Sequence, residues 1–77
     1  MRPTLKQIGA RVLAYRKRIG LTQEELAEAS NLHRSYVSQL ERGLVNPSFQ
    51  SLARIATALG VSVCDLLCPT DVEEAES

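Results

Sequence analysis

Two short helical patterns, separated by a turn, occupy residues 20–43, GLTQEELAEASNLHRSYVSQLERG. The first pattern begins at Thr22, because Thr22 and Glu25 have the spacing of a capping box, in which each side chain bonds the other's backbone. It ends near Ala29 or Ser30, since Asn31 can adopt the left-handed backbone conformation that a sharp turn requires. This stretch therefore predicts a short helix followed at once by a tight turn.

The second pattern runs from about Arg34 to Arg42 and is closed by Gly43. The apolar residues expected to form a core between the two helices are Leu26, Leu32, Val37 and Leu40. The small side chain of Ala27 leaves room for the helices to approach each other closely. Two helices joined by a turn of about four residues make a helix-turn-helix when the second can lie in a DNA major groove.

Three further helices are expected around this pair, and no segment shows the alternation of a strand. The first spans about 5–19, with apolar residues at steps of three and four, and Gly9 inside it indicates close packing against a neighbour. The fourth spans about 48–59. The fifth follows the Ser62–Asp65 capping box and ends near residue 67. The sequence predicts an all-α, compact five-helix fold.

With 77 residues the chain is one small domain, expected to fill residues 1–67 and to be followed by an acidic tail, residues 68–77. The formal net charge is zero. Four of the nine acidic residues lie in the tail, so the remaining body carries nine basic and five acidic side chains, a net charge of +4. The tail offers almost nothing to bury and is expected to be disordered. A modestly basic body is compatible with a nucleic-acid partner.

Several classes of function are excluded. No apolar run reaches the roughly 18 residues of a membrane span, and the first residues lack a hydrophobic signal core, so we expect a cytoplasmic protein. One histidine and no usefully spaced carboxylate pair leave no catalytic site, and neither a cofactor nor a small-molecule ligand is indicated. Cys64 and Cys68 provide only two of the four ligands of a structural zinc site. We expect no metal, a structural cysteine pair and a small hydrophobic role for Cys64.

Residues 8–67 closely resemble the Xre family, the DNA-binding domains of phage repressors and Cro. The likeness rests on residues 20–43 and continues through NPSFQSLARIATALGVSVCDLL. The specific part is a joint pattern, which comprises Gln23, Leu26-Ala27, Val37, Leu40-Glu41 and Gly43. Within the family, LHRSYVSQLERG is most similar to the controller proteins of restriction–modification systems. The resemblance implies a lambda-repressor-like fold in which the second and third helices form the helix-turn-helix.

The resemblance also implies which residues meet DNA. The matching positions are Gln23, Arg34, Ser35, Tyr36, Ser38, Gln39, Arg42 and Asn46, and His33, at the start of the third helix, is a further candidate for DNA contact. Arg34 suits a bidentate contact with guanine and Gln39 suits adenine, whereas Gln23, Arg42 and Asn46 match phosphate contacts. Arg16 and Glu41 match an ion pair that ties the first helix to the recognition helix.

Simpler interpretations exist for some of these residues. Outward polar residues of the third helix are also compatible with an ordinary solvated face. The ring of Tyr36 can pack on the domain while only its hydroxyl reaches outward. His33 departs from the family, which often has a good capping residue at this position. A neutral imidazole would accept a backbone N–H there, whereas a protonated one would meet a phosphate, and DNA affinity would then rise as the pH falls.

These observations predict a transcriptional regulator that binds duplex DNA as a homodimer on a palindromic or near-palindromic site. Its half-sites would lie about one helical turn, ~34 Å, apart. The dimer surface is expected on the last two helices, with Val63, Leu66 and Leu67 as candidates. The alternative is an antitoxin or adaptor whose main partner is a protein.

Overall fold

A computed structural model describes residues 3–68 of the chain. The elements are α1 (Leu5–Arg18), α2 (Gln23–Ser30), α3 (Arg34–Glu41), α4 (Phe49–Leu59) and α5 (Val63–Leu67), and no strand occurs among the described residues. The expected all-α five-helix fold is thereby confirmed, with helix ends within one residue of those predicted. The tail, apart from Cys68, lies outside the described residues, so the division of the chain at residue 67 stays a prediction.

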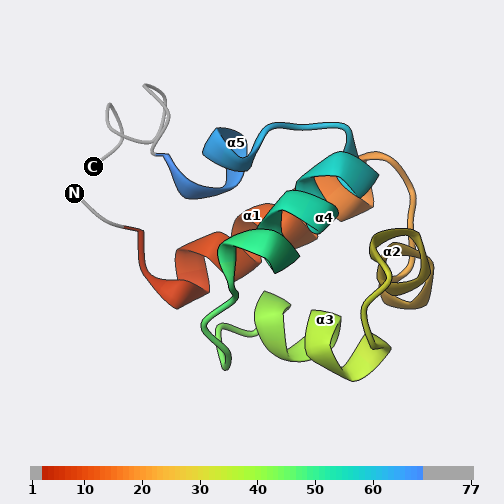
Figure 1. The fold of residues 1–77 in the computed structure, drawn as a ribbon, viewed down its shortest axis with the longest axis horizontal. Coiled ribbons are helices and arrows are strands. Elements are labelled where there is room, and N and C mark those ends of the chain that lie inside the picture. The colour runs from red at the N-terminus through yellow and green to blue at the C-terminus, as the bar shows by residue number, and fades with distance from the viewer. Residues whose placement is uncertain (1–2, 69–77) are drawn as a thin grey trace.

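Two helices pass through the middle of the fold, and two others lie along its opposite edges (Figure 1). In Figure 1, α1 and α4 pass through the middle of the molecule, α3 lies along one edge and α5 along the other. α3 packs on α1 and α2, α2 also packs on α4, and α5 packs on α1 and α4. α1 and α4 therefore support the helix-turn-helix pair on its inner side, and no helix within residues 3–68 covers the outer side of α3 (Figure 1).

One hydrophobic core joins all five helices. Its buried members are Ile8, Val12, Leu26, Ala27, Val37, Leu40, Leu52, Ile55, Ala56, Leu59 and Leu66. The core predicted between the second and third helices is present, with Leu26, Val37 and Leu40 buried and Leu32 half-buried against them. Full burial of one such side chain contributes about 1.5–3 kcal/mol, so these contacts hold α3 against the rest of the domain.

One expectation about α5 is wrong. Leu66 has an exposed fraction of 0% because it points into the core that α5 shares with α1 and α4. A side chain with no exposed surface cannot contact a second copy of the chain. Val63 and Leu67 are half-buried, and they alone remain candidates for a dimer surface.

Short polar residues start α2 and α5 as the sequence predicted. Thr22 accepts a hydrogen bond from the Glu25 backbone N–H while the Glu25 side chain accepts one from that of Thr22, and Ser62 and Asp65 repeat this capping box. Asn31, with φ +57°, ends α2 in the left-handed conformation that the tight turn requires. Local sequence therefore sets both ends of α2.

Gly9 brings α1 against the end of α3. A Cβ atom at this position would lie 2.6 Å from the carbonyl oxygen of Glu41 and would also collide with that of Leu40. Only glycine permits this approach, which confirms the close packing expected at Gly9. The contact places the C-terminal turn of α3 directly on the backbone of α1.

Candidate nucleic-acid interface

α2 and α3 are joined by a turn of three residues, Asn31 to His33. The N–H of Leu32 donates to the carbonyl of Ala27 at 2.8 Å, which closes the end of α2 as the chain reverses. α3 contacts both α2 and α1 and holds a fixed place across them. Two short helices joined in this way form a helix-turn-helix.

The outer face of α3 gathers most of the residues that the sequence analysis had singled out. Val37, Leu40 and Glu41 are buried on its inner side. The opposite side carries Arg34, Ser35, Ser38, Gln39 and Arg42, of which all but the half-buried Ser38 are exposed. The spacing of these five residues places them on one side of a helix. A single polar surface about two turns long results.

This face carries positive charge and has no exposed acid among its own residues. Between residues 29 and 64 the only acidic residue is Glu41, and its side chain is buried. Arg34 and Arg42, at the two ends of α3, are both exposed. The surface therefore has the sign that attracts phosphate groups.

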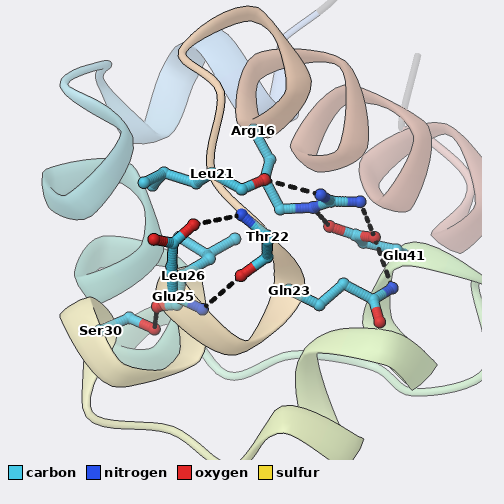
Figure 2. A network of polar contacts seen from close by, with 8 residues as sticks. All are labelled: Arg16, Leu21, Thr22, Gln23, Glu25, Leu26, Ser30 and Glu41. Atoms are coloured by element: carbon cyan, nitrogen blue, oxygen red, sulfur yellow. Dashed lines mark hydrogen bonds and ion pairs between the residues drawn. The ribbon is translucent and has the colours of Figure 1, made fainter.

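A buried network of polar side chains holds the C-terminal end of α3 in place. Arg16 Nε lies 2.6 Å from Glu41 Oε2, Arg16 Nη2 lies 3.1 Å from Glu41 Oε1, and Arg16 Nη1 donates to the carbonyl of Leu21 at 2.8 Å. Figure 2 shows the guanidinium and the carboxylate facing each other side by side. The ion pair that the resemblance implied is present, and it joins α1 to α3 through two parallel hydrogen bonds.

Gln23 belongs to the same network. Its Nε2 donates to Glu41 Oε1 at 2.9 Å (Figure 2), so the first residue of α2 is tied to the last residue of α3. Sequence reasoning matched Gln23 to a phosphate contact and did not foresee this bond, because a partner 18 positions away leaves no signal in local spacing. The amide is half-buried, and the bond to Glu41 sets its orientation.

His33 begins α3 without capping it. Its backbone has the extended conformation of a cap residue, yet its side chain makes no capping hydrogen bond and is exposed. The possibility that a neutral imidazole accepts a backbone N–H at this position is therefore not realised. The ring is available to solvent or to a ligand.

The remaining expected residues lie around this face. Tyr36 is half-buried, as expected of a ring that packs on the domain, and Asn46 is exposed in the loop between α3 and α4. Leu44, within that loop, and Phe49, the first residue of α4, are 60% and 72% exposed. Sequence reasoning did not single them out, because apolar side chains are ordinarily assigned to a core.

Among residues 3–68, no helix is both long enough and apolar enough to cross a membrane.

A short helix held across its neighbour by a tight turn, with a basic polar outer face, defines the class of helix-turn-helix DNA-binding domains. The chain belongs to the helix-turn-helix family HTH_3, whose model matches residues 12–66. This confirms the expected Xre-type domain. The protein is a DNA-binding transcriptional regulator of the helix-turn-helix type, and this family is not one of enzymes.

Individual relatives agree with this assignment. The chain is 44% identical over 66 residues to an uncharacterized HTH-type transcriptional regulator, y4dJ, of Sinorhizobium fredii, with 86% of each chain covered. The crystal structure of the restriction–modification controller protein C.AhdI from Aeromonas hydrophila matches with a TM-score of 0.79 and 42% identity, over 80% of this chain and 94% of that one. The biofilm regulator SinR, solved in complex with DNA, matches with a TM-score of 0.74 and 45% identity, over 77% of this chain and 95% of that one.

Some relatives are longer proteins, of which the chain matches only a part. It covers between 39% and 61% of the length of three further curated relatives, all of them repressors or transcriptional regulators. What those longer proteins do as wholes is therefore not carried over to this chain.

Proposed function

We propose that the protein acts in the cytoplasm as a homodimer on a palindromic or near-palindromic duplex operator, with α3 in the major groove. The observation that carries this proposal is the outer face of α3, which is polar, basic and free of exposed acids. A relative of the same fold, SinR, was solved bound to DNA, which supports the same use of the domain here.

Polar side chains of α3 read the bases in this proposal. Arg34 has the fork geometry for a bidentate contact with guanine, and Gln39 has the amide that pairs with adenine. Ser35, Ser38 and Tyr36 contact bases or backbone beside them. Each good bidentate contact contributes about 1–3 kcal/mol of discrimination against the wrong base.

Phosphate contacts flank the base-reading residues. Arg42 and Asn46 lie at the end of α3 and in the loop beyond it, where both are exposed. Gln23 approaches from α2, since an amide whose first N–H is bonded to Glu41 still has a second N–H to donate. His33, at the start of α3, meets a phosphate when it is protonated. Such contacts fix the position of α3 on the duplex but carry no sequence information.

A second copy doubles the contacts that a single eight-residue helix can make. Val63 and Leu67 of α5 are half-buried apolar side chains that a partner would cover. α5 and α3 lie at opposite edges of the domain (Figure 1), so such pairing leaves the outer face of α3 open. Half-sites about one helical turn, ~34 Å, apart are expected for a helix-turn-helix dimer.

The proposal is tested by selection from random duplex DNA at about 150 mM salt, where non-specific binding is weak. A motif of two related halves is expected, with half-site centres separated by one helical turn or a multiple of it. Light scattering of the free protein at high micromolar concentration is expected to give the mass of a dimer. No enrichment by folded protein would favour a protein partner instead, and a monomeric mass would contradict the dimer.

A further inference from the structure

Two free cysteines lie together on the edge of the fold away from α3. Cys64 is in α5, Cys68 is the residue that ends this helix, and both are exposed. The expectation that Cys64 serves as a small hydrophobe is therefore wrong. Leu66 is the buried apolar residue of α5. Packing in the hydrophobic core therefore does not explain why a cysteine stands at position 64 or 68.

The two side chains are neighbours on one side of the helix. The N–H of Cys68 donates to the carbonyl of Cys64 at 2.7 Å, which keeps the spacing of one helical turn. The neighbouring Cys68 side chain is the first cause that raises the pKa of the Cys64 thiol, and desolvation and Asp65 add to it. Spacing and exposure thus place the two thiols near each other at the surface.

This geometry does not favour a disulfide bond. Side chains four residues apart on a helix have Cβ atoms about 5–6 Å apart. A disulfide needs Cβ atoms roughly 3.5–4.5 Å apart. Closing the bond would unwind the last turn of α5 and break the hydrogen bond between Cys68 and Cys64. If one further atom lies between the two sulfur atoms, the link between the side chains is longer than a disulfide bond. The two cysteines can then be joined without unwinding the helix.

We propose that Cys64 and Cys68 form a two-thiolate chelate for a soft cation of low coordination number, Cu(I). Thiolates are soft ligands that select such ions. Zn²⁺ is a poorer fit because its structural sites use four ligands, and no group of three or more histidine, cysteine, aspartate or glutamate side chains suited to a metal occurs within residues 3–68. The sequence analysis excluded a metal by counting ligands for zinc, and that count does not apply to a two-coordinate ion.

The site is separate from the proposed DNA interface. α5 packs on α1 and α4, and Figure 1 shows it across the molecule from α3. Binding at Cys64 and Cys68 therefore leaves the outer face of α3 open. Both cysteines are exposed, so replacing either one with serine is expected to leave the fold intact.

The test is an anaerobic titration of reduced full-length protein with Cu(I) against a coloured Cu(I) chelator, with Cys64→Ser and Cys68→Ser in parallel. We expect one Cu(I) per protomer. Either variant should weaken binding by more than the roughly tenfold that loss of an outer-shell partner costs, because a direct ligand is removed. A titration with Zn²⁺ is expected to give much weaker binding.

Three results would overturn the proposal: Cu(I) binding that survives in either variant, one ion bound per two protomers, or no binding by the wild-type protein. Circular dichroism checks that the variants are folded. X-ray absorption of the copper-loaded wild-type protein gives an answer that does not depend on the variants. Two sulfur ligands at copper are expected, and three or more would contradict a chelate within one protomer.

Discussion

The side-chain amide of Gln23 donates a 2.9 Å hydrogen bond to the carboxylate of Glu41, the group that also binds the guanidinium of Arg16. Gln23 begins α2 and Glu41 ends α3, so one buried carboxylate joins the two helices of the motif to each other and to α1. The orientation of α3 thus depends on a polar network as well as on the hydrophobic core.

Replacing Gln23 with alanine is expected to weaken binding to specific and scrambled duplexes alike. The variant loses one hydrogen bond within the protein and the proposed phosphate contact, each with a net contribution of about 1 kcal/mol. Fluorescence anisotropy with both duplexes measures the change. Gln50→Ala, an exposed glutamine of α4, is the matched control and should leave both affinities unchanged. A loss confined to the specific duplex would instead make Gln23 a base-reading residue.

Replacing Glu41 with leucine is expected to cost about 3–5 kcal/mol of unfolding free energy, because it leaves Arg16 buried without a partner. The two side chains are only 10% and 3% exposed, so water cannot replace the missing charge. The double variant Arg16→Met/Glu41→Leu should recover much of this loss. Urea unfolding measures all three proteins. A single variant as stable as the wild type would show that the ion pair does not hold α3.

Replacing Gly9 with alanine is expected to destabilise the domain, although alanine is the better helix former by about 1 kcal/mol. The added Cβ would meet the backbone carbonyls of Leu40 and Glu41, and forcing α1 and α3 apart costs roughly 1–3 kcal/mol. Ala10→Gly, at the neighbouring exposed position of α1, is the control and should lose only the helix propensity. Thermal unfolding compares the two, and a more stable Gly9→Ala protein would contradict the close contact.

Replacing His33 with serine is expected to stabilise the domain by about 1 kcal/mol, because serine caps a helix and His33 does not do so here. The same variant tests whether a protonated His33 meets a phosphate. DNA affinity of the wild type should then rise as the pH falls, and the variant should lose this dependence. Equal pH profiles in the two proteins would remove His33 from the interface, and unchanged stability would contradict the capping argument.

Local signals in the sequence account for most of the fold. Thr22 with Glu25, Asn31 and the spacing of Leu26, Val37 and Leu40 act within one or two turns, so helix ends and core positions could be predicted. α5 could not be oriented in this way. It has five residues, VCDLL, and apolar side chains fall on several of its sides, so the pattern could not show that Leu66 is buried and Cys64 exposed.

The site was less accessible to sequence reasoning than the fold. The outer face of α3 follows from helical spacing, whereas the bond between Gln23 and Glu41 depends on how two helices pack. The exposure of the Phe49 side chain was not predicted either, because nothing in the local spacing distinguishes an exposed apolar residue from a buried one.

The central claim, that α3 reads bases, is tested most directly by repeating the selection from random duplex DNA with Arg34→Ala. Arg54→Ala is the matched control, since Arg54 is an exposed arginine of α4 beside Ala29 and Asn31. We expect Arg34→Ala to lose the preference for guanine at one position of each half-site, at a cost of about 1–3 kcal/mol on the wild-type motif, while Arg54→Ala keeps that motif. The same motif selected by Arg34→Ala and by the wild type would contradict the claim.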